Sequence, residues 1–243
     1  VEGSVDERTT LALTYRWYDI DNGYDAFSLD NDNKTLPDEP GFDEHQTHAV
    51  SARSTTNTAA GDFILIATHA SHNIAYGYDE DWTFTGFHPW GYTSFDAYYR
   101  DVETQTGEMR FVSSDSAALF DGMTDWTIGV FYKSTEEKLL RQYTYLDSDF
   151  ASEYTPTTTA IYAQTESRLN ENLVLVAGLR VENYEFDYAD NNQLTRAFDT
   201  TMVGGKIALQ YTQGDHFYYG SISRGYKGAG FNPDSRVNDN QRF

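Results

Sequence analysis

The sequence predicts an all-β fold, an antiparallel up-and-down sheet of about nine strands of the transmembrane β-barrel type. Apolar and polar residues alternate along runs of strand length, which places them on opposite faces of a sheet. Aromatic residues make up 16% of the chain, and there are only 5 prolines. Long and short connections also alternate along the chain, as they do in a membrane-spanning meander.

The first predicted strand covers residues 8–19, where Leu11, Leu13, Tyr15 and Trp17 share one face and more polar residues share the other. Seven further strands are predicted over residues 45–56, 63–76, 95–113, 126–145, 157–168, 173–188 and 199–211, and a last strand begins at His216. Each matches or exceeds the roughly 9–11 residues that cross a bilayer obliquely.

The connections predict how the strands are joined. Long ones are expected near residues 20–44, 77–94, 146–156 and 189–198 and from 226 onward, and short ones near 57–62, 114–125, 169–172 and 213–215. An up-and-down meander collects its long loops at one end and its short turns at the other. A soluble sandwich with Greek-key crossings does not sort its connections in this way.

The composition excludes several classes of function. A net charge of −21 argues against a nucleic-acid partner, because phosphate groups are bound by basic faces. Cysteine is absent, which excludes disulfides and thiol chemistry. No apolar run approaches the roughly 20 residues of a spanning helix. No nucleophile elbow, zinc-protease motif or phosphate-binding loop is present, so no catalytic residue is predicted.

Residues 216–233, HFYYGSISRGYKGAGFNP, change character along their length. They open as an aromatic strand, and three glycines, Gly225, Gly228 and Gly230, then favour its termination. This segment contains Tyr219 and two serines, followed by Arg-Gly-Tyr-Lys and Gly-x-Gly-Phe-Asn. The pattern resembles a late barrel strand of TonB-dependent outer-membrane receptors.

Other segments resemble the same family. Residues 107–114 are similar to its Glu-x-Arg-x-x-Ser strand, and residues 175–182 to its Gly-Leu-Arg-aromatic-Glu strand, with Val181 in the aromatic position. The resemblance implies a barrel of roughly 22 strands, an N-terminal plug domain and a segment that meets TonB. We therefore expect residues 1–243 to be an internal part of the barrel domain, with the plug domain and the C-terminal strands absent from it.

Two groups of residues are candidates for ligand contact. Arg224 and Lys227 are basic residues at the end of a strand in a very acidic chain, where they could pair with rim carboxylates or contact an anionic ferric chelate. The aromatic residues Trp82, Trp90 and Tyr92 could line a ligand entrance, form an interfacial girdle or pack a loop.

Metal sites are not predicted. The pairs His45/His48 and His69/His72 each have a spacing of three, which on a strand puts the two rings on opposite faces. Residues 19–25 resemble a calcium loop, but the glycine is one position early and no glutamate follows at the twelfth place. A solvated acidic loop is the preferred interpretation, and no cofactor is expected.

The resemblance implies a receptor in the outer membrane of a Gram-negative bacterium, surrounded by lipid and driven by the TonB system through its plug. A ferric siderophore is the expected ligand, with haem, cobalamin and oligosaccharides left open. Two alternatives remain from the residues themselves. One is a soluble carbohydrate-binding β-sandwich, and the other is a small outer-membrane porin or enzyme.

Overall fold

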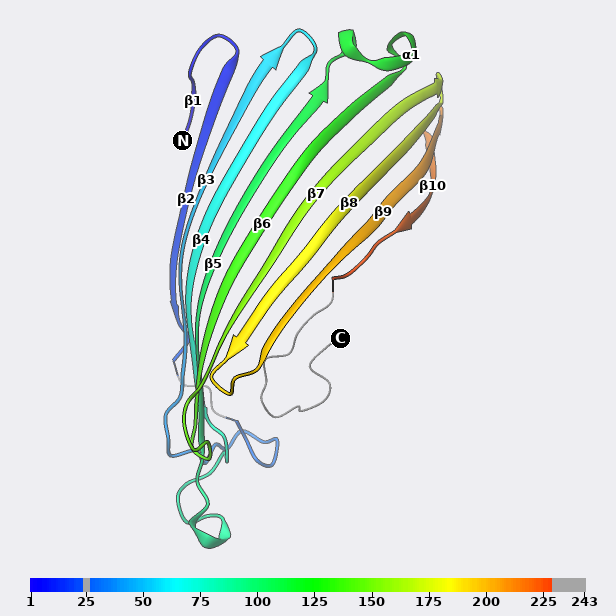
Figure 1. The fold of residues 1–243 in the computed structure, drawn as a ribbon. Coiled ribbons are helices and arrows are strands. Elements are labelled where there is room, and N and C mark those ends of the chain that lie inside the picture. Colours follow the sequence, from blue (N-terminus) through cyan, green and yellow to red (C-terminus); the bar gives the residue numbers. More distant parts are fainter. Residues whose placement is uncertain (24–26, 229–243) are drawn as a thin grey trace.

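The computed structural model describes residues 1–23 and 27–228, which form one curved antiparallel sheet (Figure 1). Its ten strands lie side by side in their order along the chain. They are β1 (Glu2–Ser4), β2 (Thr9–Asp21), β3 (Phe42–Thr58), β4 (Gly61–Asp79), β5 (Phe95–Ser113), β6 (Thr124–Tyr143), β7 (Phe150–Asn170), β8 (Leu173–Asp190), β9 (Thr195–Gln213) and β10 (His216–Arg224). Three short turns of helix, η1 (Pro89–Gly91), η2 (Asp115–Ala117) and α1 (Leu119–Gly122), lie in the connections.

This topology confirms the predicted meander and makes the β-sandwich alternative wrong, because the described residues form a single sheet without Greek-key crossings. The nine predicted strands are β2–β10. The prediction missed β1, which contributes three residues paired with Thr10–Ala12. Three residues are too few for an alternating pattern to be read. Among the described residues, no helix is long and apolar enough to cross a bilayer.

The prediction of long loops at residues 146–156 and 189–198 is wrong. The connections after β6 and β8 cover only residues 144–149 and 191–194, since the strands continue through their acidic ends. Phe186 and Tyr188 are buried there, and Tyr154, Tyr184 and Phe198 pack against them. This aromatic cluster favours continued pairing where the sequence looks polar. The long connections that remain, residues 22–41 and 80–94, lie at the same end of the sheet, which we call the loop end.

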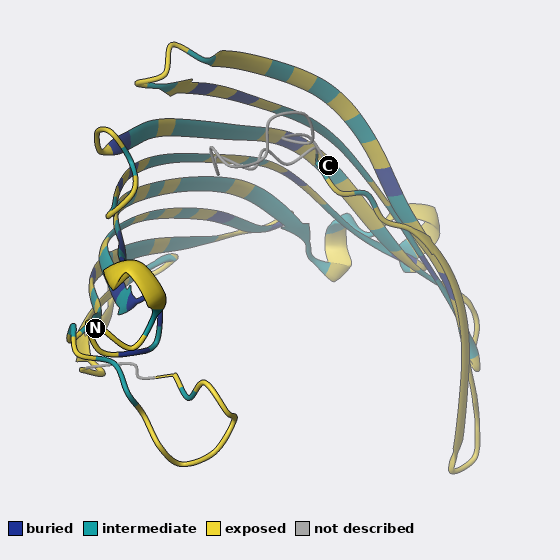
Figure 2. Ribbon diagram, turned by 90° about the horizontal axis from the view of Figure 1, so that it is seen from below, coloured by how far each residue is buried: buried dark blue, intermediate teal, exposed yellow. Residues whose placement is uncertain are grey.

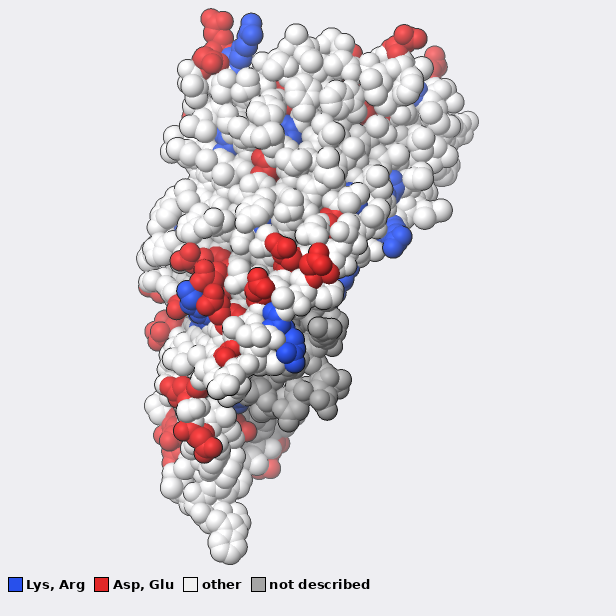
Figure 3. Space-filling model, viewed as in Figure 1, with Lys and Arg blue, Asp and Glu red and all other residues white. Residues whose placement is uncertain are grey.

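One face of the sheet is apolar near the short turns and acidic near the loop end. Pairing places Leu65, Met109, Val130, Ile161 and Val203 in one row on this face, and their side chains are 40–51% exposed. Further along the same strands and on the same face come acidic residues such as Glu103, Glu136 and Glu185. In Figure 3 the acidic side chains correspondingly gather below a broad region with few charged atoms.

The opposite face carries most of the buried side chains. Among them are Ile64, Leu139, Phe150, Ala160, Phe186 and Tyr188. Side chains converge on the inside of a curved sheet and diverge on its outside, so this face is the concave one. Seen from the loop end, the sheet forms an open trough, and exposed and less exposed residues alternate along its strands (Figure 2). The apolar convex band is where an outer-membrane barrel meets lipid.

Candidate functional site: the concave wall and the loop end

Charged and aromatic side chains form a connected group on the concave face, in a groove of about 730 Å³. At its centre, Arg180 of β8 donates hydrogen bonds to Glu182 from Nε at 2.8 Å and from Nη2 at 2.6 Å. Its Nε also lies 3.1 Å from the hydroxyl of Tyr226, which in turn donates to Glu182 at 3.2 Å. The guanidinium carbon lies 5.2 Å from the ring centre of Phe131, within the range of a cation–π contact.

The group extends across the sheet to β5. Tyr162 of β7 lies with its ring centre 6.0 Å from the Arg180 guanidinium carbon and donates a short hydrogen bond to Glu108. Arg110 forms an ion pair with the same carboxylate at 3.6 Å. We call Glu108, Arg110, Phe131, Tyr162, Arg180, Glu182 and Tyr226 the wall cluster.

Two glycines make room for these rings. A Cβ atom on Gly204 would lie 2.6 Å from Cε1 of Tyr226, and one on Gly129 would lie 2.5 Å from the hydroxyl oxygen of Tyr162. A side chain at either position would therefore push a tyrosine away from the wall. Both glycines lie in strand interiors, where glycine often marks such a close approach.

The sequence contained signals for the wall cluster that the site prediction did not use. The two segments that resemble family strands, residues 107–114 and 175–182, supply Glu108, Arg110, Arg180 and Glu182. Alternation puts Leu179 and Val181 on the convex face and therefore Arg180 and Glu182 on the concave one. Tyr226 follows the last strand, so no alternation could assign it to a face.

Arg224 borders the groove of the wall cluster through its backbone, whose carbonyl oxygen would lie 2.9 Å from a Cβ atom on Gly204, but its side chain points to the other face. Arg224 is the last residue of β10 and pairs with Gly205, which gives it the same face as Ile222 and Tyr218, the convex face. Strand β10 ends well short of the loop end (Figure 1), although we expected its glycine-rich end there. Lys227 is exposed beyond the strand. Residues Gly230–Pro233 of the motif lie outside the described residues.

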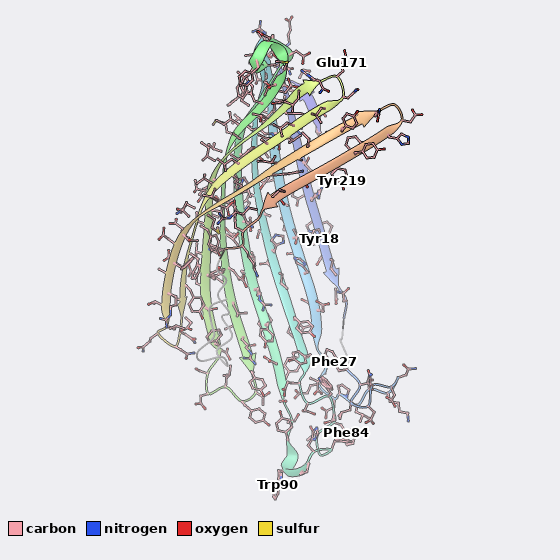
Figure 4. The ribbon with its side chains drawn as sticks, turned by 90° about the vertical axis from the view of Figure 1, so that its right-hand side faces the viewer. Tyr18, Phe27, Phe84, Trp90, Glu171 and Tyr219 are labelled. Atoms are coloured by element: carbon pink, nitrogen blue, oxygen red, sulfur yellow. The ribbon has the colours of Figure 1, made fainter. Side chains whose placement is uncertain are left out.

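The three predicted aromatic residues all lie in the connection between β4 and β5, in different surroundings. Trp82 stacks on Phe27 at 5.2 Å between ring centres, so it joins two loops. Trp90 is fully exposed, and Figure 4 shows it at the outermost point of the loop end, far from Tyr219 of β10. Tyr92 stacks on Tyr145 at 5.4 Å and donates a hydrogen bond to Glu80 at 2.9 Å.

Buried carboxylates hold this connection in place. One oxygen of Asp79 accepts hydrogen bonds from the backbone N–H groups of Asp38 and Glu39, and the other from Trp82. Asp81 accepts from the backbone of Thr83 and Ser94. Burial raises the pKa of the Glu39 carboxyl, and the nearby Asp79, Asp38 and Asp81 raise it further.

A buried ion pair lies where the sheet meets the loop end. Two nitrogens of the Arg141 guanidinium group, Nε and Nη2, donate hydrogen bonds to Asp96 at 2.8 and 2.7 Å. The rings of Tyr98 and Tyr143 flank the guanidinium carbon at 5.2 and 5.1 Å. This bidentate pair joins β5 to β6 at the base of the long connection, so its role there is structural.

The two rings of the His45/His48 pair lie on opposite faces of the sheet, and so do the two rings of the His69/His72 pair. Neither pair is therefore brought together, as expected. Within the described residues, no group of three or more His, Cys, Asp or Glu side chains is arranged to hold a metal ion. In the segment that resembles a calcium loop, Asp21 accepts a hydrogen bond from the backbone of Gly23, and Asp25 lies outside the described residues.

Comparison with known proteins adds evidence for the family. The model of the family described as TonB dependent receptor-like, beta-barrel matches residues 2–241. No curated protein sequence matches the chain.

Solved structures share its fold. The ferric yersiniabactin uptake receptor FyuA from Yersinia pestis superposes with a TM-score of 0.73 at 15% identity, covering 93% of this chain and 36% of that one. The siderophore receptor PiuA from Acinetobacter baumannii gives 0.67 at 13% identity, with 91% and 40% covered. The copper transporter OprC gives 0.67 at 12% identity, with 93% and 35% covered. The chain thus spans well under half the length of each.

Proposed function

Because the chain belongs to the TonB-dependent receptor-like β-barrel family, whose members are outer-membrane transport receptors, we propose that it forms part of the wall of a receptor that imports a ferric siderophore. In this proposal the barrel binds and guides the ligand without covalent chemistry. A plug domain and the TonB system, which lie outside these residues, supply the gate and the energy.

The observation that carries the proposal is the division of the sheet into two faces. The convex face has an apolar band, as expected against lipid, whereas the concave face carries the wall cluster of charged and aromatic groups. A sheet with this division suits a barrel whose lumen holds a polar ligand or plug. Two of the similar structures are receptors for siderophores, which favours a ferric chelate over other nutrients.

We assign the first ligand contacts to Trp90 and Tyr92 at the loop end, and a cationic contact to Lys227. Trp90 is fully exposed at the outermost point of the loop end, so packing within this structure does not account for an aromatic residue there. Trp82 is left out because it packs on Phe27, and Arg224 because it lies on the convex face.

The test is uptake of radiolabelled nutrients by the native bacterium, with the label on the metal of each substrate, comparing the parent with a strain that lacks the gene for this chain. Iron-starved cells would be offered a panel of ferric siderophores, with haem, cobalamin and copper salts as parallel substrates. We expect loss of uptake for one ferric siderophore and its recovery when the gene is restored. Loss for haem, cobalamin or copper alone would contradict the siderophore assignment, and unchanged uptake of all substrates would contradict an import role.

A Trp90→Ala variant tests the loop-end contact. We expect it to raise the ligand concentration needed for half-maximal uptake by about tenfold, the effect of losing one aromatic contact worth about 1.4 kcal/mol. Phe217→Ala is the matched control, because Phe217 is also an exposed aromatic residue but lies on β10, away from the loop end.

A further inference from the structure

We propose that the connection between β5 and β6, residues 114–123, anchors the sheet in the membrane by inserting Leu119 and Phe120 into a phospholipid headgroup layer. The connection contains η2 and α1 and lies at the end of the sheet opposite the loop end, which we call the turn end (Figure 1). The turns 59–60, 171–172 and 214–215 at the same end are much shorter. The inference concerns how the wall is held in the bilayer, so it does not depend on the imported ligand.

Two large apolar side chains of this connection are exposed. Leu119 is 47% exposed and Phe120 is 71% exposed. The backbone of Phe120 is in the left-handed region, at φ 54° and ψ 58°, which is unfavourable for a bulky residue. The chain therefore holds an aromatic ring outward at a cost in backbone strain. Contact of the ring with an apolar environment would offset that cost.

The connection continues the convex apolar band. An antiparallel bridge pairs Leu119 with Thr124, the first residue of β6, and directly paired residues share a face. Alternation gives Thr124 the same face as Trp126 and Val130. Nε1 of Trp126 donates a hydrogen bond to the carbonyl oxygen of Ala117 at 3.0 Å. Leu119 thus lies on the convex face, one row beyond Trp126.

Aromatic residues mark both edges of this band. At the turn end, Trp126 stacks on Phe111 at 5.5 Å between ring centres. At the other edge, Tyr15 and Trp17 of β2 are 65% and 56% exposed. Register carries the row of Trp17 across the sheet to Glu136 of β6, ten residues from Trp126. Such a stretch covers about 33 Å along a strand and about 25 Å along the membrane normal at a tilt of roughly 40°, which is the height of the apolar band in outer-membrane barrels.

The same geometry gives the depth of Leu119. Thr124 is two residues beyond Trp126, so the row that contains Leu119 lies about 5 Å outside the aromatic edge. The headgroup layer on each side of the hydrocarbon core is about 5–8 Å thick. Leu119 therefore lies within that layer, and Phe120 follows it directly. Leucine and phenylalanine are typical of the apolar surfaces that proteins bury at this boundary, so we take phospholipid rather than a soluble protein as the partner.

Hydrogen bonds fix the connection at both ends. Trp126 holds the end that contains η2. At the other end, Nη2 of Arg168 donates to the carbonyl oxygen of Gly122 at 2.8 Å, and Nη1 of the same residue lies 3.3 Å from a carboxylate oxygen of Asp125. The anchor is therefore ordered before it meets lipid, which reduces the entropy lost on insertion.

The first experiment measures the depth of residue 120. The chain has no cysteine, so Phe120→Cys provides a single attachment point for a nitroxide spin label. In phosphatidylcholine vesicles, collisions with oxygen, which concentrates in the bilayer, are compared with collisions with a water-soluble nickel chelate. We expect the ratio of oxygen to nickel collisions to be higher than in Glu171→Cys, whose exposed residue lies in a two-residue turn at the same end (Figure 4). Equal ratios at the two positions would overturn the proposal.

A second experiment compares Phe120→Gly with Asp121→Gly. Both residues have a positive φ, 54° and 59°, so glycine relaxes the backbone at either position, but only the first change removes an apolar ring. In urea titrations of the protein in the same vesicles, the folding equilibrium constant of Phe120→Gly should be about tenfold below that of Asp121→Gly, because the ring loses its transfer free energy from water. Equal constants, or a higher one for Phe120→Gly, would contradict insertion.

Discussion

Arg180 shows how one side chain on a strand can organise a large part of the concave wall. It contacts Glu182 on its own strand, Phe131 on β6, Tyr162 on β7 and Tyr226 beyond β10. Alternation decides its face, because Leu179 and Val181 on either side belong to the apolar convex band. At this scale the sequence specifies the face of a residue reliably but not the distant partners that it meets.

Replacing Gly129 by alanine tests the close approach of Tyr162 to the wall. The new methyl group would lie 2.5 Å from the Tyr162 hydroxyl oxygen, so the ring must move away from Glu108. We expect a loss of about 1–3 kcal/mol in the free energy of unfolding, the usual cost of overpacking. Urea titration in lipid vesicles, followed by tryptophan fluorescence, measures it.

Gly107→Ala is the control for that substitution. Gly107 lies in the interior of the neighbouring strand β5, and a Cβ atom there would have nothing within 4 Å. Its unfolding free energy should match or exceed that of the parent, because alanine loses less backbone entropy on folding. Equal destabilisation by the two substitutions would mean that strand glycines matter through backbone freedom rather than through the room they leave for tyrosine.

At the scale of elements, the sequence predicted which segments are strands better than where they end. Polar, acidic residues at the loop end of β7–β9 looked like loops, yet the strands run through them because Phe186, Tyr188 and Phe198 pack together on the concave face. Neighbouring strands satisfy the backbone hydrogen bonds of such a polar extension. Strand ends therefore depend on contacts between strands, which a single sequence does not display.

The connection between β2 and β3 should be held less firmly as the pH rises. Because burial and Asp79 raise the pKa of Glu39 above its ordinary 4.5, folding favours the protonated carboxyl. The stabilisation is complete below the unfolded pKa and disappears as the pH rises through the folded pKa. We expect the amides of Asp38 and Glu39, which donate to Asp79, to lose protection over that range in hydrogen exchange corrected for intrinsic rate.

Glu39→Gln supplies the comparison for this pH dependence. The amide cannot ionise, so protection of the two amides in the variant should change less over the same range and should exceed that of the parent at neutral pH. A pH dependence identical in parent and variant would contradict the assignment of the effect to Glu39.

At the scale of the whole molecule, alternation and strand length predicted a sheet with a lipid face, and the structure confirms the meander. The candidate site was harder to predict. The predicted residues come from separate segments, Trp90 from the connection between β4 and β5 and Lys227 from beyond β10, and the wall cluster draws its members from strands distant in the sequence. Such groupings follow from register and curvature, which arise only when all the strands pair.

A cation placed in the convex band tests that this face meets lipid. Val130 lies between Met109 and Ile161 and is 47% exposed. Val130→Arg should lower the unfolding free energy in vesicles by about 2–4 kcal/mol, the cost of arginine near the bilayer midplane. Thr127→Arg, on the concave face of the same strand between Val112 and Gln164, should cost less than half as much. Equal costs would contradict the assignment of the faces.

The order of the strands also determines how the molecule should yield to mechanical force. Among the described residues, each strand pairs only with the strands next to it in the sequence. Load applied at one end of the chain therefore reaches one hairpin at a time. If the C-terminal side is pulled from a membrane, β9 and β10 should detach as one hairpin before the load reaches β7 and β8.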